Sequence, residues 1–511
     1  MPTRERDRYL SRRRFLGLGA AVAVASLLGG VARAQGERPT ASLSANRSLG
    51  QLGHRGLEQF GQPFAGLKSS RQSGDWSLTG VDSGLQSAVS LTPLESTSTQ
   101  GAVRGRSSLA PAGLSSIKGE SLTFAAEHFG QGQRVSLRLG SQGLSLVDEA
   151  AGLYTSPVIA APLPFTSVGP HWAGDLPASS EVSVQVRTSA DAKVWSPWQT
   201  VELETPFGST KAPKWFGSLV SASSPGETDR YAQFRVRLAK AASGLAEVPL
   251  LSQMTLTFID SSAGPTTEEG LRMQSANPVQ PAVVLPAAVA MPPTLWRVNW
   301  GCPEGESSPG WPPEYRAVTH LAIHHTASSN GISNWAAHVR DIWYYHAVTL
   351  DWGDIGYNYL VDPNGVVYEG RAGGNDVCAA HVYGFNTSGT MGVAALGTYS
   401  SVGVSSSLQS SLEGVLAWKC SLAGLDPAGY RSITGYTSCS PLTVNHPVIS
   451  GHRDFPGHNW SNRHECNPYG TTACPGDRLE AILPSVRGNV VLRVQASVPQ
   501  PFKAFLPLVR R

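Results

Sequence analysis

The sequence predicts a multidomain protein in which a β-sandwich-like region precedes a mixed α/β region. A chain of 511 residues is too long for one ordinary domain. Residues 120–262 alternate apolar and polar side chains with the period of a strand, whereas residues 294–487 mix strand and helix patterns. A Pro- and Ala-rich stretch at residues 263–293 separates the two regions.

Composition narrows the class of protein. With 41% hydrophobic and 15% charged residues, the chain can bury a sizeable core, and its 54 glycines indicate much β-rich or irregular sequence. The formal net charge of +3 is close to balance. The charge therefore gives no reason to expect a nucleic-acid partner.

Residues 1–34 are predicted to be a twin-arginine signal peptide and are left out of the fold. The string Ser11-Arg12-Arg13-Arg14-Phe15-Leu16 fits a twin-arginine motif, and Ala32-Arg33-Ala34 is a small-x-small cleavage site. The alternative is an uncleaved membrane anchor, for which the 17 apolar residues 15–31 are marginal. We expect an exported protein that begins near Gln35 and has no membrane span after cleavage.

The next two segments are a low-complexity linker at 35–115 and the β-sandwich-like region at 120–262. Short alternating runs between Gly, Pro and Ser turns indicate strands with one buried face. The alternating sets are Val135, Leu137 and Leu139; Val182, Val184 and Val186; Phe234, Val236 and Leu238; and Met254, Leu256 and Phe258. Four tryptophans here either stack on sugar rings or pack within the sheets: Trp172, Trp195, Trp198 and Trp215.

Residues 263–293 are expected to form an extended, semi-stiff linker, so the regions on either side should fold independently. In the region 294–487, residues His320–His324 are expected to form a buried strand. Residues 488–511 are expected to form a C-terminal tail. Further expected elements are a helix capped by Ser333-Asn334 and running to Tyr345, a hairpin of 357–361 with 366–369, a helix at 407–423 and a last helix from Asp477.

Three short strings in this region carry the ligand types that zinc prefers. They are Ile323-His324-His325-Thr326-Ala327, Gly451-His452-Arg453-Asp454 and Cys474-Pro475-Gly476-Asp477. Three protein ligands leave the fourth tetrahedral position for water, which is the arrangement of a catalytic zinc site. A fourth string, Asp354-Ile355-Gly356-Tyr357-Asn358, supplies a phenol. Each string on its own also has an interpretation without a metal. The His pair could be packed in a core, Gly-His-Arg-Asp could be a turn, and the cysteine could form a disulfide.

As an ordered set, these strings resemble the peptidoglycan recognition protein and type 2 N-acetylmuramoyl-L-alanine amidase family, which includes phage lysozyme-like amidases. The resemblance extends over roughly residues 296–487. It also includes Asn299-Trp300-Gly301, Gly365-Val366-Val367-Tyr368-Glu369-Gly370-Arg371, Ala380-His381 and Gly384-Phe385-Asn386. It implies a central mixed sheet flanked by helices and hydrolysis of the amide bond between N-acetylmuramic acid and L-alanine in bacterial peptidoglycan.

The resemblance implies that His324, His452 and Cys474 bind Zn²⁺, with His324 rather than His325 as the ligand of its pair. Tyr357 matches the tyrosine that orients or deprotonates the attacking water. Other matched positions face the developing oxyanion (Thr472) or line the peptidoglycan groove, where structural hydrogen bonds are the alternative (His346, His381 and Asn386).

One departure from the family is the gap of 22 residues between His452 and Cys474, which is usually much shorter. The insert at 455–471 is either a lid over the cleft or a source of rival ligands, since it carries His458, His464 and Cys466. Export favours disulfides, and two bridges with one free thiol would fit the other cysteines, their pairing left open: Cys302, Cys378, Cys420, Cys439 and Cys466.

Three functions are compatible with the sequence. The first is a zinc amidase of the cell wall or envelope. The second is a non-catalytic peptidoglycan-binding protein, against which the intact ligand set argues. The third is a structural or adhesive protein of the wall surface, in which the β-rich region does the binding.

Overall fold

The computed structural model describes residues 117–147, 150–176, 180–204, 214–223, 228–240, 248–276, 289–305, 312–436, 441–455 and 472–497. These residues belong to one compact unit. The predicted signal peptide, the predicted linker at 35–115, most of the insert and the end of the tail lie outside this part of the chain. The same holds for Cys439 and Cys466, so the predictions made for these segments stay predictions.

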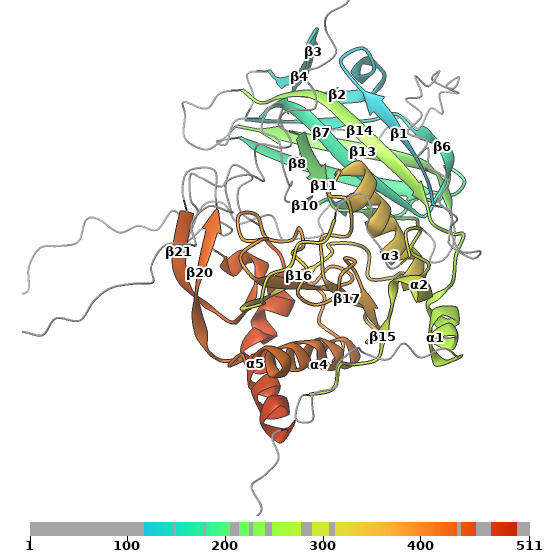
Figure 1. Ribbon diagram of the computed structural model, residues 1–511. Helices are drawn as coiled ribbons and strands as arrows, with labels where there is room; N and C mark the ends of the chain where they lie inside the picture. The colour runs from blue at the N-terminus through green and yellow to red at the C-terminus, as the bar shows by residue number, and fades with distance from the viewer. Residues whose placement is uncertain are drawn as a thin grey trace, which may run out of the picture. The chain divides into compact units, whose positions relative to one another are not determined.

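Two antiparallel sheets precede residue 261 (Figure 1). In its described part, the first has the order β10 (Leu203–Glu204), β11 (Lys214–Gly217), β7 (Ser167–Asp175), β14 (Leu250–Asp260), β4 (Gly143–Leu146) and β3 (Leu137–Gly140), with β1 (Lys118–Phe124) beside β14 and β12 (Val220–Ser221) beside β7. The second has the order β2 (Gln133–Val135), β5 (Ala151–Thr155), β13 (Asp229–Ala239), β8 (Glu181–Ser189) and β9 (Gln199–Thr200), with β6 (Ile159–Phe165) beside β13.

Side chains of both sheets meet in one apolar core. The alternating residues of β8, β13 and β14 point into it, among them Val184, Phe234 and Phe258. One predicted strand is wrong, because the set Val135, Leu137 and Leu139 does not lie on a single strand. Ser136 between them has a left-handed backbone (φ 54°), so β2 ends before it and β3 begins after it.

The tryptophans of this region favour the packing interpretation. Trp172 is buried in the core. The Arg187 guanidinium lies 4.7 Å from the ring centre of Trp195 and 4.6 Å from that of Trp198, and Arg235 lies 4.5 Å from Trp198. Cation–π stacking therefore engages the rings of Trp195 and Trp198.

A mixed sheet organises the C-terminal region, as the family resemblance implied. Its order in the described residues is β15 (Thr294–Leu295), β18 (Val367–Glu369), β17 (Tyr359–Val361), β19 (Thr390–Ala395), β16 (His320–His325) and β22 (Ile449–Gly451). All neighbours are parallel except β17 and β18, which form the predicted hairpin. A separate pair consists of β20 (Tyr430–Tyr436) and β21 (Pro441–Pro447).

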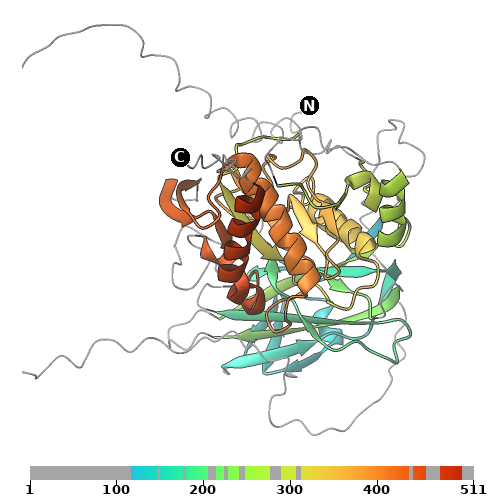
Figure 2. The ribbon, with the colours of Figure 1, turned by 90° about the horizontal axis from the view of Figure 1, so that it is seen from below.

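Helices cover both faces of the mixed sheet. On one face, α4 (Ser406–Ala423) and α5 (Asp477–Ser497) lie side by side (Figure 2) and pack on Leu321 and Ile323 of β16. On the other face, α3 (Trp335–Tyr344) packs with Leu360 of β17 and Ala394 of β19. Because side chains of a strand alternate between faces, His324 lies on the face opposite to α4 and α5.

Helix starts follow the cap residues. The Asn334 side chain accepts a hydrogen bond from Ala337 N (3.2 Å), which confirms the predicted cap of α3. The Ser405 hydroxyl accepts one from Leu408 N (3.1 Å), so α4 begins one residue before the predicted start. These side chains satisfy backbone donors that a helix leaves free at its first turn.

Part of the expected linker is ordered. Residues Thr267–Ala276 form the helix α1, and α2 (Arg297–Trp300) follows β15. A capping box stabilises the start of α1: Glu269 N donates to Thr266 Oγ1 (3.2 Å) and Thr266 N donates to Glu269 Oε2 (2.8 Å). The prediction of an extended linker is therefore wrong for residues 267–276.

The β-rich region and the α/β region share a buried polar interface. Thr166 Oγ1 and Ser167 Oγ donate hydrogen bonds of 2.8 and 2.6 Å to the two carboxylate oxygens of Asp341 on α3. Next to it, the fully buried Arg340 donates to the carbonyl oxygens of Ser261, Pro265 and Trp300. The two regions are therefore packed against each other, and their independent folding stays a prediction.

Replacing Asp341 with alanine is expected to lower the free energy of unfolding by about 3 kcal/mol, because two buried hydroxyls lose a charged acceptor. Asp341→Asn should lose less, since an amide can still pair with both hydroxyls. The control is Glu268→Ala, which removes an exposed ion pair with Arg272 and should change stability by less than about 1 kcal/mol. Urea unfolding measures all three variants, and equal stability of Asp341→Ala and the control would contradict the interface.

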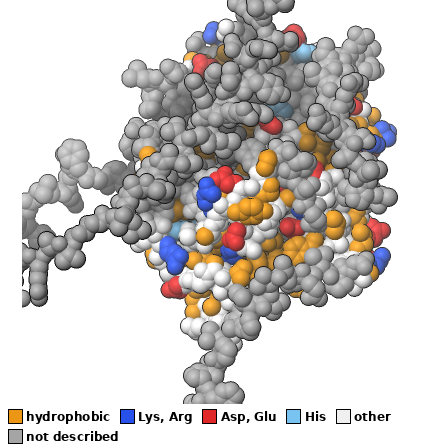
Figure 3. Space-filling view, viewed as in Figure 1, with side chains coloured by type: hydrophobic (Ala, Val, Ile, Leu, Met, Phe, Trp, Pro, Cys, Tyr) orange, Lys and Arg blue, Asp and Glu red, His pale blue; other side chains and the backbone are white. Residues whose placement is uncertain are grey.

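The surface is mixed in character. On the face in Figure 3, described acidic and basic side chains lie close together among hydrophobic ones, in keeping with the near-balanced charge. Within the described ranges, no helix has the length and apolar character needed to cross a membrane.

Candidate metal centre

Two adjacent parallel strands bring the predicted histidines together. In the register of β16 and β22, Ile323 lies opposite Gly451. His324 is the next residue of β16, near the end of that strand, and His452 is the first residue after β22, so both imidazoles lie at the carboxyl edge of the sheet. Their ring centres are 4.6 Å apart.

Cys474 completes the cluster from the segment before α5. One donor atom from each of His324, His452 and Cys474 lies within 4.8 Å of the others, and all three side chains are buried. Cys474 Sγ is 3.6 Å from His324 Nδ1. Zinc bonds of about 2.3 Å to sulfur and about 2.0 Å to nitrogen at a tetrahedral angle place such atoms roughly 3.5 Å apart. The donor set and this spacing fit a tetrahedral zinc ion.

The Cys474 thiol is held by the strand that carries the first histidine. His325 N donates a hydrogen bond to Cys474 Sγ (3.4 Å), and Arg453 N donates to the Cys474 carbonyl oxygen (3.0 Å). Burial raises the pKa of the thiol well above its ordinary value. Coordination reverses this preference, because a thiol that binds a metal cation is deprotonated. The buried thiol is therefore suited to bind, as a thiolate, a metal cation that prefers sulfur ligands.

The second ring nitrogen of His324 faces His381. His324 Nε2 lies 3.0 Å from His381 Nδ1, and His381 Nε2 lies 3.3 Å from Thr390 Oγ1. Burial lowers the pKa of His381 to about 3, which favours a neutral ring whose Nδ1 can accept a hydrogen bond from His324 Nε2. Such a partner orients a ligand imidazole and fixes its tautomer. His381 lines the cleft, as predicted, but its contacts are those of a support for His324.

Asn386 supports the same arrangement one step further out. Its Oδ1 accepts hydrogen bonds from the backbone N–H groups of His381 (2.9 Å) and Val382 (2.7 Å). The side chain is buried, with 8% of its surface exposed. These contacts favour the structural alternative for Asn386, which holds the loop that carries His381.

Tyr357 lies against the candidate ligand His324, with ring centres 5.2 Å apart. Burial and the neighbouring acidic side chains, Glu204 first among them, raise the pKa of the phenol well above its ordinary value. His346 packs on Tyr357 and accepts a hydrogen bond from Gly356 N (3.0 Å), so it positions the segment that carries the tyrosine. Burial lowers the pKa of His346 to about 3, and the ring is neutral.

Thr472 lies at the edge of the same cleft. Its hydroxyl oxygen accepts a hydrogen bond from Cys474 N (3.1 Å). The hydroxyl proton remains available as a donor. Thr472 therefore lies beside Cys474 in the cleft, and its contact with the oxyanion stays a prediction.

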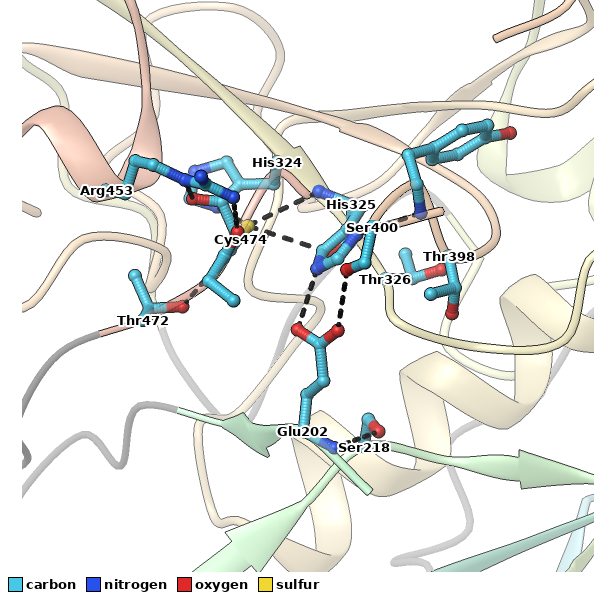
Figure 4. Close-up of polar contacts among 12 residues, drawn as sticks. Glu202, Ser218, His324, His325, Thr326, Thr398, Ser400, Arg453, Thr472 and Cys474 are labelled. Carbon is cyan, nitrogen blue, oxygen red and sulfur yellow. Dashed lines mark hydrogen bonds and ion pairs between the residues drawn. The ribbon is translucent and has the colours of Figure 1, made fainter. Parts of the chain in front are cut away.

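His325 points away from the donor cluster and has other partners (Figure 4). Its Nδ1 accepts a hydrogen bond from Tyr399 N (3.3 Å), and its Nε2 lies 2.9 Å from Glu202 Oε2. This supports His324 as the ligand of the pair. Glu202 belongs to the β-rich region and was not among the predicted site residues, because a contact across 123 residues leaves no local pattern.

Three of the remaining cysteines, Cys302, Cys378 and Cys420, are free thiols. Two disulfide bridges among the five non-ligand cysteines are therefore excluded, and that expectation is wrong. Burial raises the pKa values of all three thiols.

Comparison with known proteins places residues 314–477 in the N-acetylmuramoyl-L-alanine amidase family model. The chain is 36% identical over 103 residues to peptidoglycan-recognition protein SA of Drosophila melanogaster, which is 20% of this chain and 48% of that protein. It is 36% identical over 134 residues to peptidoglycan-recognition protein SC2 of Drosophila simulans, which is 25% of this chain and 70% of that protein. The chain thus spans about half of one relative and over two thirds of the other.

Among solved structures, Drosophila PGRP-LB matches 38% of this chain and 92% of its own, with 22% identity and a TM-score of 0.28. The residues that match the family model include all three candidate metal ligands. The chain belongs to the peptidoglycan recognition protein and type 2 N-acetylmuramoyl-L-alanine amidase family.

Proposed function

We propose that the protein is a zinc-dependent amidase that hydrolyses the bond between N-acetylmuramic acid and L-alanine in bacterial peptidoglycan. Family membership supports peptidoglycan binding or amidase activity. The observation that carries the finer proposal is the buried cluster of His324, His452 and Cys474, whose donor atoms lie within 4.8 Å of one another. A two-His, one-Cys set leaves a coordination position open for water and substrate.

The ion would supply a water of near-neutral pKa and polarise the scissile carbonyl. The Tyr357 hydroxyl stays protonated at neutral pH and can orient the attacking water by a hydrogen bond. The Thr472 hydroxyl can donate to the oxygen that becomes negative as the carbonyl carbon turns tetrahedral. The chain's own residues therefore place a hydrogen bond at the nucleophile and another at the developing charge.

The main alternative is a binding protein without catalysis. A binding protein would need only a groove for peptidoglycan. It would need neither a complete set of metal ligands nor hydroxyl groups beside the attacking water and the developing oxyanion. Here Tyr357 and Thr472 line the same cleft as the three candidate ligands. This coincidence favours the enzyme over the binding protein. The third possibility, a wall-surface adhesive protein, has less support because the tryptophans Trp195 and Trp198 stack on arginines.

The location follows from the substrate. Peptidoglycan lies outside the cytoplasmic membrane, and the predicted twin-arginine signal at residues 1–34 would deliver the protein there. We therefore propose a secreted protein of the cell wall or envelope, with peptidoglycan as its partner.

The proposal is tested on a soluble muropeptide of defined structure. Incubation with the purified protein should release an intact stem peptide with a free N-terminal L-alanine and leave N-acetylmuramic acid with its lactyl carboxylate. Mass spectrometry distinguishes this pair from products cut within the sugar or the peptide. Binding of the muropeptide without any cleavage would favour the binding protein instead.

A further inference from the structure

The β-rich region reaches into the candidate active site. The cleft that contains His324, His452 and Cys474 is also lined by Glu202, Leu203 and Glu204. Leu203 and Glu204 form β10, which lies at one end of the described part of the first sheet. One wall of the cleft therefore comes from outside the residues that match the amidase family model, which begin at 314.

The contact is specific. Glu202 Oε2 lies 2.9 Å from His325 Nε2, and the Ser400 hydroxyl donates to Glu202 Oε1 (3.2 Å; Figure 4). Both carboxylate oxygens are thus engaged by the α/β region, one by the residue next to the candidate ligand His324. Burial alone would raise the pKa of Glu202, but the pairing with His325 outweighs it and the pKa is lowered.

The backbone of this wall is fixed by other residues of the β-rich region. Glu202 N donates to Ser218 Oγ (3.1 Å), and Ser218 N donates back to the Glu202 carbonyl oxygen (2.8 Å). Val201 N donates to Val184 O of β8 (3.0 Å). With its backbone held on one side and its carboxylate on the other, Glu202 sets the separation between β10 and the end of β16.

We propose that the segment Glu202–Glu204 forms a substrate-facing wall of the cleft and that Glu202 is a positioning residue that holds it in place. This rests on the proposed function, with a muramoyl peptide as the substrate. It assigns the β-rich region a part in binding the substrate of the neighbouring α/β region. Leu203 and Glu204 are then the side chains that the bound muramoyl peptide meets on this side.

The test compares the full chain with Glu202→Ala, Glu202→Gln and the control Glu181→Ala. Glu181 lies on the second sheet and pairs with Arg237 at a partly exposed site. Steady-state kinetics on a soluble muropeptide give KM and kcat separately, while zinc content and thermal unfolding report on the site and the fold. Calorimetric binding of the same muropeptide gives a reading that needs no turnover.

Glu202→Ala should raise KM and the binding Kd about tenfold, as expected for losing hydrogen bonds of a charged group. Its kcat, zinc content and unfolding temperature should stay near those of Glu181→Ala. Glu202→Gln should recover most of the affinity, because its amide can still pair with His325 and Ser400. Unchanged KM and Kd in Glu202→Ala would overturn the proposal.

If Glu202→Ala loses zinc or has a lower unfolding temperature, the variant Ser400→Ala tests the proposal instead, since it removes only one hydroxyl that holds Glu202. A rise in Kd at full zinc content then supports the wall, and an unchanged Kd refutes it. Failure of the proposed function gives a different result. If the wild-type protein binds the muropeptide without cleaving it, the proposed amidase activity is wrong. The effect of Glu202→Ala on Kd still tests whether Glu202–Glu204 forms a wall of the binding site.

Discussion

Cys474→Ser should lose its bound zinc and with it roughly a thousandfold or more of its turnover. A thiolate is the softest of the three ligands, and a neutral serine hydroxyl replaces it poorly. Several kcal/mol of transition-state stabilisation from the ion would be lost, and each 1.36 kcal/mol is tenfold in rate. Metal analysis of the purified variant and kinetics on a muropeptide measure both effects.

The control for this variant is Cys378→Ser. Cys378 is a half-buried free thiol outside the donor cluster, so its replacement should leave zinc and turnover unchanged. Full zinc in Cys474→Ser would contradict the assignment. If Cys466→Ser lost the metal instead, the insert at 455–471 would supply the third ligand.

Tyr357→Phe should keep its zinc and its fold while losing about two to three powers of ten in kcat, the usual effect of removing one donor at the reacting atoms. The phenylalanine ring can keep the packing on His324 and His346. Only the hydroxyl is lost, and its raised pKa means that it acts as a hydrogen-bonding group and not as an ionised base. Kinetics, metal content and unfolding temperature separate these effects.

Tyr315→Phe is the matched control, because Tyr315 is 54% exposed and lies outside the lining of the cleft. It should behave as the wild type. Wild-type turnover in Tyr357→Phe would show that the hydroxyl takes no part in the reaction. Loss of zinc together with turnover would mean that the ring, through its packing on His324, carries the effect.

Elements with a strong local signal were predictable from the sequence. The strand that carries His324, the helix capped by Asn334 and the hairpin of β17 and β18 all lie where period and cap residues indicated. The donor set was predictable because each ligand sits in a short string of recognisable order. Even the missed helix α1 had a signal, the pair Thr266 and Glu269 of a capping box.

What the sequence could not provide is contact between distant segments. Asp341 meets Ser167 across 174 residues, and His325 meets Glu202 across 123. No period or spacing links such residues, because their proximity depends on how two sheets and a helix pack. The Pro-rich composition of residues 263–293 suggested that the two regions are separate for the same reason. The composition of a linker carries no information about whether the surfaces of the regions that it joins fit each other.

Most of the candidate site was predictable by residue type but not by role. His381 and Asn386 were expected along the groove, and their hydrogen bonds show a chain of support that ends at His324. That distinction depends on which ring nitrogen faces which neighbour. No sequence pattern determines it.

The most direct test of the account is mass spectrometry of a soluble muropeptide incubated with the wild-type chain in three states: as purified, after complete chelation of zinc, and after zinc is restored. The stem peptide with a free N-terminal L-alanine should be released in the first and third states, and the muropeptide should stay intact in the second. Undiminished release from the metal-free protein would contradict a zinc-dependent reaction.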